Sequence, residues 1–346
     1  MKNIAALLTG KEKIEFFDYP MPTLGDDDVL VEIKHCGICG SDVGVYADPT
    51  VGGALDITLP VMLGHESAGV VVGLGANVTD LAIGDKVALE PGVPCGKCEA
   101  CLRGDYNLCD DVIFMAAPPF TTGAMCKYVA HPRSRTFKLP EGMSTIEGAL
   151  MEPFSVGMFA AQHGEVDLTQ SVAIIGGGCI GMMTALACRA RGCTNIIIAD
   201  LFDSHLEVAR KLGFTKVFNS TGKDLAQCVR ELNGGRGVDV AFETAGSAYV
   251  VGKLPGMVRR GGTIVLVGNI MKPVEFDFWS ISYNQIAIKP IFRYKHLYPA
   301  CIAVTAAGNA AVSDIGIKVY PFSEAPAAFD CALHDKLNTL KVIVEF

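Results

Sequence analysis

The sequence predicts an α/β protein of two domains, one β-rich and irregular and the other built on a doubly wound parallel sheet. Its 346 residues are enough for two domains of ordinary size, each with its own core. Half of the residues are hydrophobic and 38 are glycine, which suits many buried strands joined by tight turns. Near Glu147 the pattern changes from short β segments to strands that alternate with helices.

The β-rich domain is predicted over residues 1–154. This part contains short apolar segments broken by Gly, Pro and Asp, such as "DDVLVEIKHCGIC", "AGVVVGLG" and "GDKVALEPG", and it has few regular helices. The tail, residues 291–346, returns to this mixed character, so we expect it to rejoin the first domain.

The doubly wound sheet is predicted over residues 155–290. Six short apolar runs are typical of buried parallel strands: "SVAIIG", "TNIIIAD", "KVFN", "GVDVAFET", "GTIVLVG" and "QIAIKP". Helical segments lie between them, and both "DSHLEVARKLG" and "GKDLAQCVRELNGG" close with glycine, as helix C-termini do. Six strands with helical crossovers predict a doubly wound sheet.

Charge and thiol content limit the classes of partner and compartment. The net charge is −8 and no basic run occurs, which argues against nucleic acid and anionic membranes as partners. The most apolar stretch, "SVAIIGGGCIGMMTALA", is too short and too rich in glycine for a membrane-spanning helix. The chain has 13 cysteines, and its N-terminal segment does not resemble a secretory signal peptide. We therefore expect a reducing compartment and a cytoplasmic protein.

A glycine turn after the strand "SVAII" indicates a dinucleotide site. Gly176, Gly178 and Gly181 fit the G-x-G-x-x-G pattern, whose glycines allow a tight turn, close approach of a pyrophosphate and close helix–strand packing. Asp200 ends the next strand, 19 positions after Gly181. Its carboxylate would accept hydrogen bonds from the adenosine ribose and repel a 2′-phosphate, which favours NAD over NADP. The alternative is a plain glycine turn.

Four cysteines form a second motif, C-x2-C-x2-C-x7-C, at Cys95, Cys98, Cys101 and Cys109. Four thiolates fill a tetrahedral zinc shell and leave no position for water or substrate, so the motif predicts a structural zinc. An iron–sulfur cluster is the main alternative. Ferredoxin runs place the fourth cysteine sooner and follow it with proline, whereas Asp110 follows here.

A catalytic zinc needs three protein ligands and one open position. The candidates are Cys39 in "HCGICGSD", His65 and Glu66 in "LGHESAG", and Glu152 in "LMEPFSVG". Spacing alone does not assemble these four residues, and each could have an ordinary surface role. Cys36 and Cys39 could also form a redox pair, although no thioredoxin-like context surrounds them.

The chain as a whole resembles the zinc-dependent medium-chain alcohol dehydrogenases. The motifs that carry the likeness are "GHESAG", "GANVTDLAIGDKVALEPG", the four-cysteine segment, "GGGCIG" and "IIIAD". Within that family, "YNLC", "FMAAPPFTTGAMCKYVAHP", "GALMEPFSVG" and "IFRYKHLYP" resemble the sorbitol and xylitol dehydrogenase branch. The resemblance implies a GroES-like catalytic domain, a Rossmann domain, and NAD-dependent oxidation of a polyol's secondary hydroxyl to a ketose.

The resemblance also implies roles for single residues. Cys39, His65 and Glu66 match the catalytic zinc ligands, Glu152 matches a carboxylate that binds zinc or its water, and Ser41 matches a proton-relay hydroxyl. Phe114, Arg293 and Tyr294, together with Glu152, match substrate-pocket groups. Cofactor contacts are implied at Gly176, Gly178, Ile180, Gly181, Asp200, His205, Val267, Gly268 and Phe292. The implied cofactors are NAD and two zinc ions per chain, and the implied assembly is a homotetramer or homodimer.

Three positions depart from the family pattern. Gly44 stands where many relatives have a relay histidine, Val45 where animal sorbitol dehydrogenases have a substrate-contacting tyrosine, and His205 where an adenine-stacking arginine is common. The alternatives are a dehydrogenase for a sugar-alcohol phosphate or for an amino alcohol such as threonine, and a non-catalytic or redox-sensing protein. The segment 45–60 contains no Lys or Arg, which favours a neutral polyol. The sequence leaves open which polyol is used, the direction of the reaction, and whether Glu66 or Glu152 is the third ligand.

Overall fold

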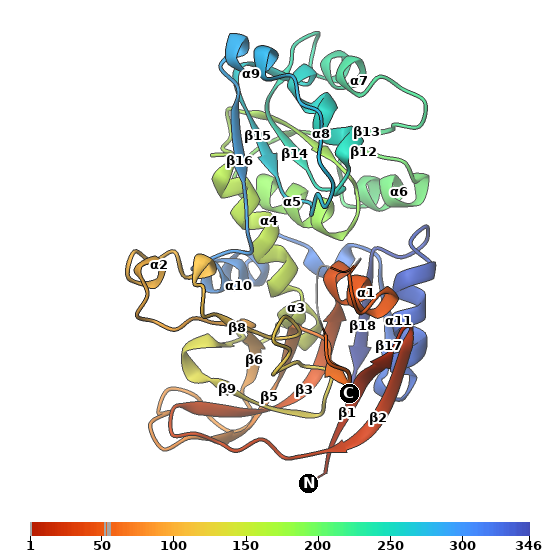
Figure 1. Cartoon of the computed structure of the whole chain (residues 1–346). Helices are drawn as coiled ribbons and strands as arrows, with labels where there is room; N and C mark the ends of the chain where they lie inside the picture. Colours follow the sequence, from red (N-terminus) through yellow and green to blue (C-terminus); the bar gives the residue numbers. More distant parts are fainter. Residues whose placement is uncertain (1, 52, 54–56) are drawn as a thin grey trace. The chain divides into compact units, whose positions relative to one another are not determined.

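The structure is a computed structural model that describes residues 2–51, 53 and 57–346. It divides into two compact units (Figure 1): Met1–Glu152 with Tyr298–Ala306 and Gly316–Phe346, and Pro153–Leu297 with Ala307–Ile315. Compared with the predicted domains, residues 153–154, 291–297 and 307–315 go with the second unit. One reason is that the Ile291 N–H donates to the Leu266 carbonyl at 3.0 Å, which ties the chain after the last strand to the second unit's sheet.

The first unit is built on antiparallel β structure around one apolar core. A seven-stranded sheet has the order β10-β6-β5-β3-β18-β17, with β9 also paired to β3, and a smaller sheet has the order β2-β1-β4. The strands are β1 Asn3–Gly10, β2 Lys13–Tyr19, β3 Asp28–Ile38, β4 Val61–Met62, β5 Glu66–Leu74, β6 Lys86–Leu89, β7 Gly92–Val93, β8 Ile113–Phe114, β9 Tyr128–Pro132, β10 Thr136–Lys138, β17 Ile317–Pro321 and β18 Lys341–Glu345.

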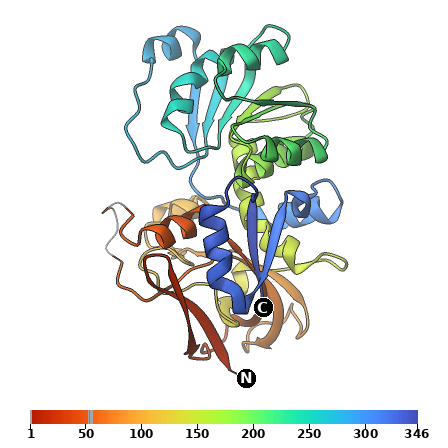
Figure 2. The ribbon, with the colours of Figure 1, turned by 90° about the vertical axis from the view of Figure 1, so that its right-hand side faces the viewer.

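The C-terminal strands β17 and β18 are part of this unit's main sheet. β18 pairs antiparallel with β3, and Val342 lies opposite Ile38. Helix α11 (Ala325–His334) packs against β17 and β18 (Figure 2). The other helices of the unit are short: α1 Gly40–Ala47, α2 Glu99–Leu102, α3 Thr145–Ala149 and α10 Tyr298–Ala306. α4 (Met151–His163) contains the boundary between the units.

The second unit confirms the doubly wound sheet. Six parallel strands have the order β13-β12-β11-β14-β15-β16. They are β11 Ser171–Ile175, β12 Asn195–Asp200, β13 Lys216–Asn219, β14 Val238–Glu243, β15 Val258–Leu266 and β16 Ala287–Pro290, and they fall on the six predicted runs. The chain moves outward from β11 to β13 and then returns to β14, so the direction of winding reverses between β11 and β14.

Helices connect these strands: α5 Cys179–Ala190, α6 Asp203–Lys211, α7 Leu225–Leu232, α8 Ala248–Lys253 and α9 Phe278–Asn284. As predicted, a glycine follows the C-terminus of both α6 and α7. Gly213 and Gly234 take positive φ angles of 88° and 68° there, as helix-terminating glycines do. None of the described helices has both the length and the apolar character needed to cross a bilayer.

Candidate active site

Cys39, His65 and Glu66 come together in the first unit although they lie on separate segments. Their ligand atoms lie within 4.8 Å of one another. Strand pairing brings them together, because β3 leads into Cys39 and β5 begins at Glu66, which lies opposite Gly37 of β3. A thiolate, an imidazole and a carboxylate are ligands that Zn²⁺ takes in catalytic sites, and three of them leave a fourth position open. The donor set therefore fits an open zinc site.

Asp42 is a buried carboxylate beside this group that the sequence analysis did not identify. It lies on α1, where its Oδ2 accepts the Cys39 N–H at 3.0 Å and its Oδ1 accepts the Gly64 N–H at 3.1 Å. Oδ1 also lies 3.5 Å from Nδ1 of His65. Burial opposes ionisation, but His65 and the N–H donors outweigh it and hold the pKa of Asp42 below its ordinary value. Asp42 can therefore orient the imidazole so that Nε2 is left for a metal.

Lys341 is a second residue that sequence reasoning missed. It is 4% exposed, and its ammonium group forms an ion pair with the Glu66 carboxylate and donates to the Ile38 carbonyl at 3.0 Å. Glu66 on β5 and Lys341 on β18 flank the central strand β3, and they meet over Gly37. A Cβ at Gly37 would collide with the Glu66 carboxylate and lie 3.0 Å from the Lys341 Cε. The glycine therefore provides the space in which the two charges meet.

Glu152 lies outside the group formed by Cys39, His65 and Glu66 among the described residues. It is 5% exposed and belongs to the first turn of α4. The sequence did not decide whether Glu66 or Glu152 is the third zinc ligand. In the structure, Glu66 is the one whose carboxylate lies within 4.8 Å of the other ligand atoms.

The remaining predicted residues of this unit lie on α1 and β8. Ser41 is exposed in the first turn of α1. The Phe114 ring lies 5.6 Å from the His65 ring, centroid to centroid, and can form an apolar wall. Gly44 is exposed, with open space where a side chain would project, whereas Val45 packs into the core. Within the segment 45–60, residues 52 and 54–56 lie outside the described part of the chain.

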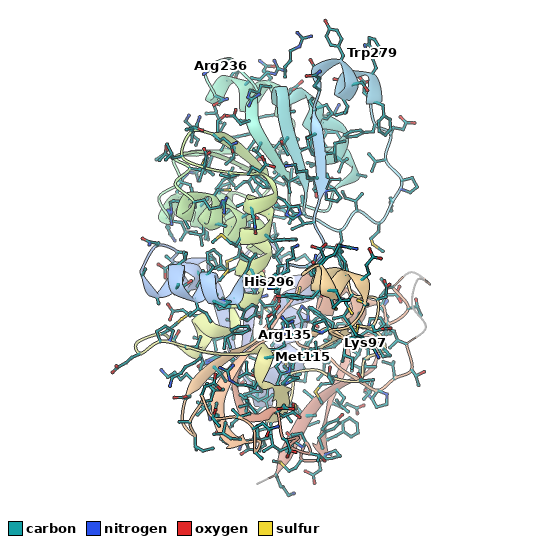
Figure 3. The ribbon with its side chains drawn as sticks, turned by 90° about the vertical axis from the view of Figure 1, so that its left-hand side faces the viewer. Lys97, Met115, Arg135, Arg236, Trp279 and His296 are labelled. Carbon is teal, nitrogen blue, oxygen red and sulfur yellow. The ribbon has the colours of Figure 1, made fainter. Side chains whose placement is uncertain are left out.

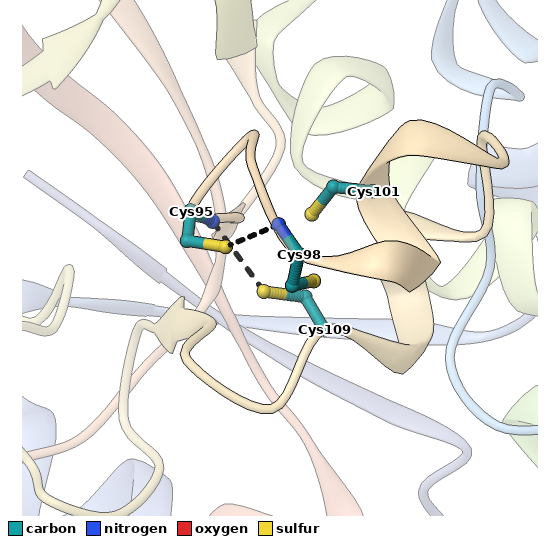
Figure 4. A group of neighbouring side chains, drawn as sticks. All are labelled: Cys95, Cys98, Cys101 and Cys109. Carbon is teal, nitrogen blue, oxygen red and sulfur yellow. Dashed lines mark hydrogen bonds between the residues drawn. The ribbon is translucent and has the colours of Figure 1, made fainter.

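The four cysteines of the second motif form a compact cluster (Figure 4). Their sulfur atoms lie within 4.8 Å of one another, with Cys109 on the chain after α2. The Cys95 N–H donates to Sγ of Cys109, and the Cys98 N–H donates to Sγ of Cys95, both at 3.4 Å. Hydrogen bonds from the N–H groups of Lys97 and Cys98 lower the pKa of Cys95 to about 7. Four converging thiols, of which Cys95 has a lowered pKa, fit a closed structural zinc site.

A buried polar network attaches this four-cysteine segment to the sheet. The Tyr106 hydroxyl donates to Oε1 of Glu90 at 2.7 Å, and the Arg135 guanidinium donates to Oε2 at 3.0 Å. The same guanidinium lies 4.0 Å above the Tyr106 ring centroid; Arg135 is labelled in Figure 3. Glu90 is therefore fully paired although it is buried.

The glycine turn of the second unit has the geometry of a phosphate cradle. Gly176 takes a φ of 115°, which favours glycine, and a side chain at Gly181 would collide with the Gly176 carbonyl. Beside Gly178, the N-cap of α5, there is open space within 4 Å of the position where a Cβ would lie. A phosphate can therefore approach the backbone at the helix N-terminus.

Asp200 and His205 line a cavity of about 410 Å³ next to this turn. Oδ2 of Asp200 accepts the Gly177 N–H at 2.6 Å, and Oδ1 accepts the Phe202 N–H at 2.8 Å and lies 3.3 Å from Nδ1 of His205. Burial opposes ionisation of Asp200, but His205 and the N–H donors lower its pKa below the ordinary value. The cavity is also lined by Gly176, Gly178, Ala199, Ser220, Thr244, Ser247, Tyr249 and Val250. It fits the adenosine half of a dinucleotide.

The other predicted cofactor and substrate residues of the second unit lie elsewhere. Ile180 is on α5, outside the lining of this cavity, and Val267 and Gly268 follow β15. Phe292 is 55% exposed, and the Arg293 guanidinium lies 4.7 Å from its ring centroid. Tyr294 is buried.

Family comparisons agree with both units. The model of the alcohol dehydrogenase GroES-like domain matches residues 25–141, and the model of the zinc-binding dehydrogenase domain matches residues 179–307. The chain belongs to the zinc-dependent medium-chain alcohol dehydrogenases. The GroES-like and Rossmann domains implied by the resemblance are thereby confirmed, and the protein is an oxidoreductase.

Individual relatives place this dehydrogenase in the polyol branch of the family. It is 38% identical to sorbitol dehydrogenase of Bacillus subtilis over 343 residues, which is 98% of this chain and 96% of the relative. It is also 38% identical to D-xylulose reductase of Morganella morganii over 310 residues, 89% of this chain and 91% of the relative. Among solved structures, an Escherichia coli oxidoreductase of unknown specificity is 37% identical, with a TM-score of 0.95 and coverage of 100% and 99%.

Proposed function

We propose that this dehydrogenase oxidises a secondary hydroxyl of a polyol such as xylitol or sorbitol to a ketose, with NAD as the hydride acceptor. The observation that carries the proposal is the open group Cys39–His65–Glu66 in a chain whose relatives include a sorbitol dehydrogenase and a D-xylulose reductase. A metal in this group, with nicotinamide as acceptor, would supply the Lewis acid and the hydride acceptor for the reaction.

The chain's own residues would hold, orient and deprotonate the substrate. Cys39, His65 and Glu66 would hold the metal, and Asp42 would orient the His65 imidazole through its contact with Nδ1. Ser41 is exposed beside Cys39, so its hydroxyl can pass the substrate proton to solvent without a histidine at position 44. We propose that Phe114 bounds the pocket and that Arg293 and Tyr294 contact the polyol chain.

We further propose that the cofactor is NAD rather than NADP. The support is Asp200, whose ionised carboxylate lines the adenosine cavity and would repel a 2′-phosphate. His205 beside it is compatible with this choice because its ring already pairs with the carboxylate.

The proposal includes two zinc ions per chain, a cytoplasmic location and a homodimer or homotetramer. Five of the 13 cysteines lie in the two metal groups, which fits thiols used as metal ligands in a reducing compartment. The exposed aromatic side chains of Phe278, Trp279 and Tyr283 on α9 offer apolar surface for association.

The test is NADH formation by the zinc-loaded protein with xylitol, sorbitol, galactitol, threonine, a sugar-alcohol phosphate and ethanol. We expect at least one five- or six-carbon polyol to have a kcat/KM about tenfold or more above that of ethanol, because a small alcohol lacks the hydroxyls that align the reacting carbon. Equal efficiency on ethanol and on the best polyol, or a preference for threonine or the phosphate, would contradict the proposed substrate class.

A further inference from the structure

Glu243 is a fully buried carboxylate at the carboxyl end of β14 that has no part in the metal groups. Its exposed fraction is 0%. Oε1 accepts the N–H groups of Ala245 and Ser247 at 3.1 and 3.0 Å. Oε2 accepts the N–H of Gly246 at 3.1 Å, and the Glu243 backbone carbonyl accepts the N–H groups of Val267 and Gly268 at 2.9 Å. Glu243 therefore binds backbone from two loops.

The first of these loops lines the dinucleotide site, and the second packs against the first. The first loop, residues 244–247, lines the adenosine cavity through Thr244, Ala245 and Ser247. The second begins at Val267 and Gly268, whose N–H groups both donate to the Glu243 carbonyl at 2.9 Å. A Cβ at Gly268 would lie 2.5 Å from Oε2 of Glu243, so only a glycine allows this approach.

The contacts of Glu243 are those of an anion. Its oxygens accept hydrogen bonds from three backbone N–H groups, none of which could accept a proton from the carboxyl. Burial is the larger influence and raises the pKa of Glu243 above its ordinary value, while the N–H donors oppose this shift and favour the ionised form. The donors around both oxygens therefore favour a carboxylate anion at the base of the loops that follow β14 and β15.

The sheet order indicates which half of a bound dinucleotide would lie nearer Glu243. Asp200 ends β12, the glycine turn follows β11, and Glu243 ends β14, so the three lie in that order across the sheet. A dinucleotide crosses such a sheet at the point where the winding reverses, here between β11 and β14. With the adenosine at Asp200 and the pyrophosphate at the turn, the nicotinamide half extends toward the ends of β14 and β15.

We propose that Glu243 is a positioning residue that shapes both loops and whose charge favours the positively charged oxidised nicotinamide over the neutral reduced ring. The proposal rests on the proposed use of NAD. The pyridinium ring of NAD⁺ carries a positive charge that NADH lacks, so a nearby buried anion stabilises bound NAD⁺ selectively. Loop shape, in contrast, affects both forms alike.

The experiment measures dissociation constants of NAD⁺, NADH and ADP-ribose by calorimetry. The proteins are the wild type, Glu243→Gln and Glu243→Met, which remove the charge, and Glu243→Asp, which keeps it. Glu231→Gln, which removes an exposed carboxylate on α7, is the matched control. Circular dichroism shows which variants are folded. If only one of Glu243→Gln and Glu243→Met folds, that variant alone is enough to measure the effect of removing the charge.

For the charge-free variants we expect the ratio Kd(NAD⁺)/Kd(NADH) to rise roughly 3- to 10-fold over the wild-type ratio. ADP-ribose, which ends before the nicotinamide, reports loop shape alone. The ratio should stay within about twofold of wild type in Glu243→Asp and Glu231→Gln. An unchanged ratio in the charge-free variants, or an equal rise in Glu243→Asp, would overturn the inference. A wild type that binds neither NAD⁺ nor NADH would instead contradict the proposed function.

Discussion

Replacing Lys341 by methionine tests how the buried charges of the candidate active site depend on one another. Methionine preserves much of the side-chain volume on β18 but removes the ammonium group that pairs with Glu66. Side chains of both partners are at most 3% exposed, so water cannot replace the lost ion pair. Leaving one member of a buried pair without its partner costs about 3–5 kcal/mol. For a unit of this size, 1 kcal/mol corresponds to roughly 2–4 °C, so the Tm of the metal-free protein should fall by about 6–20 °C.

The assay is thermal unfolding of Lys341→Met with and without zinc, beside the matched control Lys318→Met. Lys318 lies on the neighbouring strand β17 and pairs with Asp335 at 2.6 Å, but both side chains are more than one-third exposed. Removing that pair should cost less than about 1 kcal/mol. Added zinc should recover part of the Lys341→Met loss, because the Glu66 carboxylate regains a cation. Equal Tm shifts in the two metal-free variants would refute the reasoning.

Three further predictions concern the cofactor, pH and packing. Asp200→Ala should narrow the preference for NAD over NADP by about tenfold or more, measured as the ratio of kcat/KM values, and a wild type that prefers NADP would show that Asp200 is misassigned. Burial lowers the pKa of His131 to about 4, below the unfolded value of about 6.5, so the unfolded state binds more protons between these values. Stability should therefore fall by up to about 3 kcal/mol as pH drops from 6.5 to 4, and His131→Gln should flatten this slope in urea titrations. Gly37→Ala should destabilise the fold by about 1–3 kcal/mol and weaken zinc binding in a chelator competition, because its Cβ collides with the Glu66 carboxylate.

Much of the second unit could be predicted from the sequence because its signals are local. Each buried parallel strand is a short apolar run, and all six runs became strands. The glycine turn and Asp200 depend on residues that lie within one strand–helix–strand segment. The four-cysteine cluster is equally local, since its ligands lie within 15 consecutive positions, Cys95 to Cys109.

The open metal group could not be assembled from spacing, because its residues meet only through strand pairing. Cys39 and His65 are brought together by the antiparallel alignment of β3 with β5, which no local pattern encodes. The resemblance to a family supplied this group instead. The resemblance did not point to Lys341, because in the sequence this residue looks like any charged residue at the start of a strand.

Asp42 and Glu243 were missed for a similar reason, although each left a weak signal. Asp42 stands three residues after Cys39, at the N3 position of α1, where a carboxylate can bind back to the N-cap N–H. Glu243 ends the apolar run "VDVAFE", and a charge at the carboxyl end of a buried strand is a common sign of a ligand site. Both carboxylates depend on backbone N–H groups that only the folded chain brings close.

If chemistry takes place at Cys39, His65 and Glu66 and not at the four-cysteine cluster, substitutions at the two metal groups should have different consequences. The most direct test compares Cys39→Ser with Cys98→Ser by zinc analysis, thermal unfolding and polyol oxidation on the same preparations. Each variant should lose one of two zinc ions. Cys39→Ser should remain folded with almost no turnover, whereas Cys98→Ser should unfold at a lower temperature while its soluble fraction keeps measurable activity in the cold. A Cys98→Ser protein that is as stable as wild type but inactive would place the catalysis in the cluster and contradict this account.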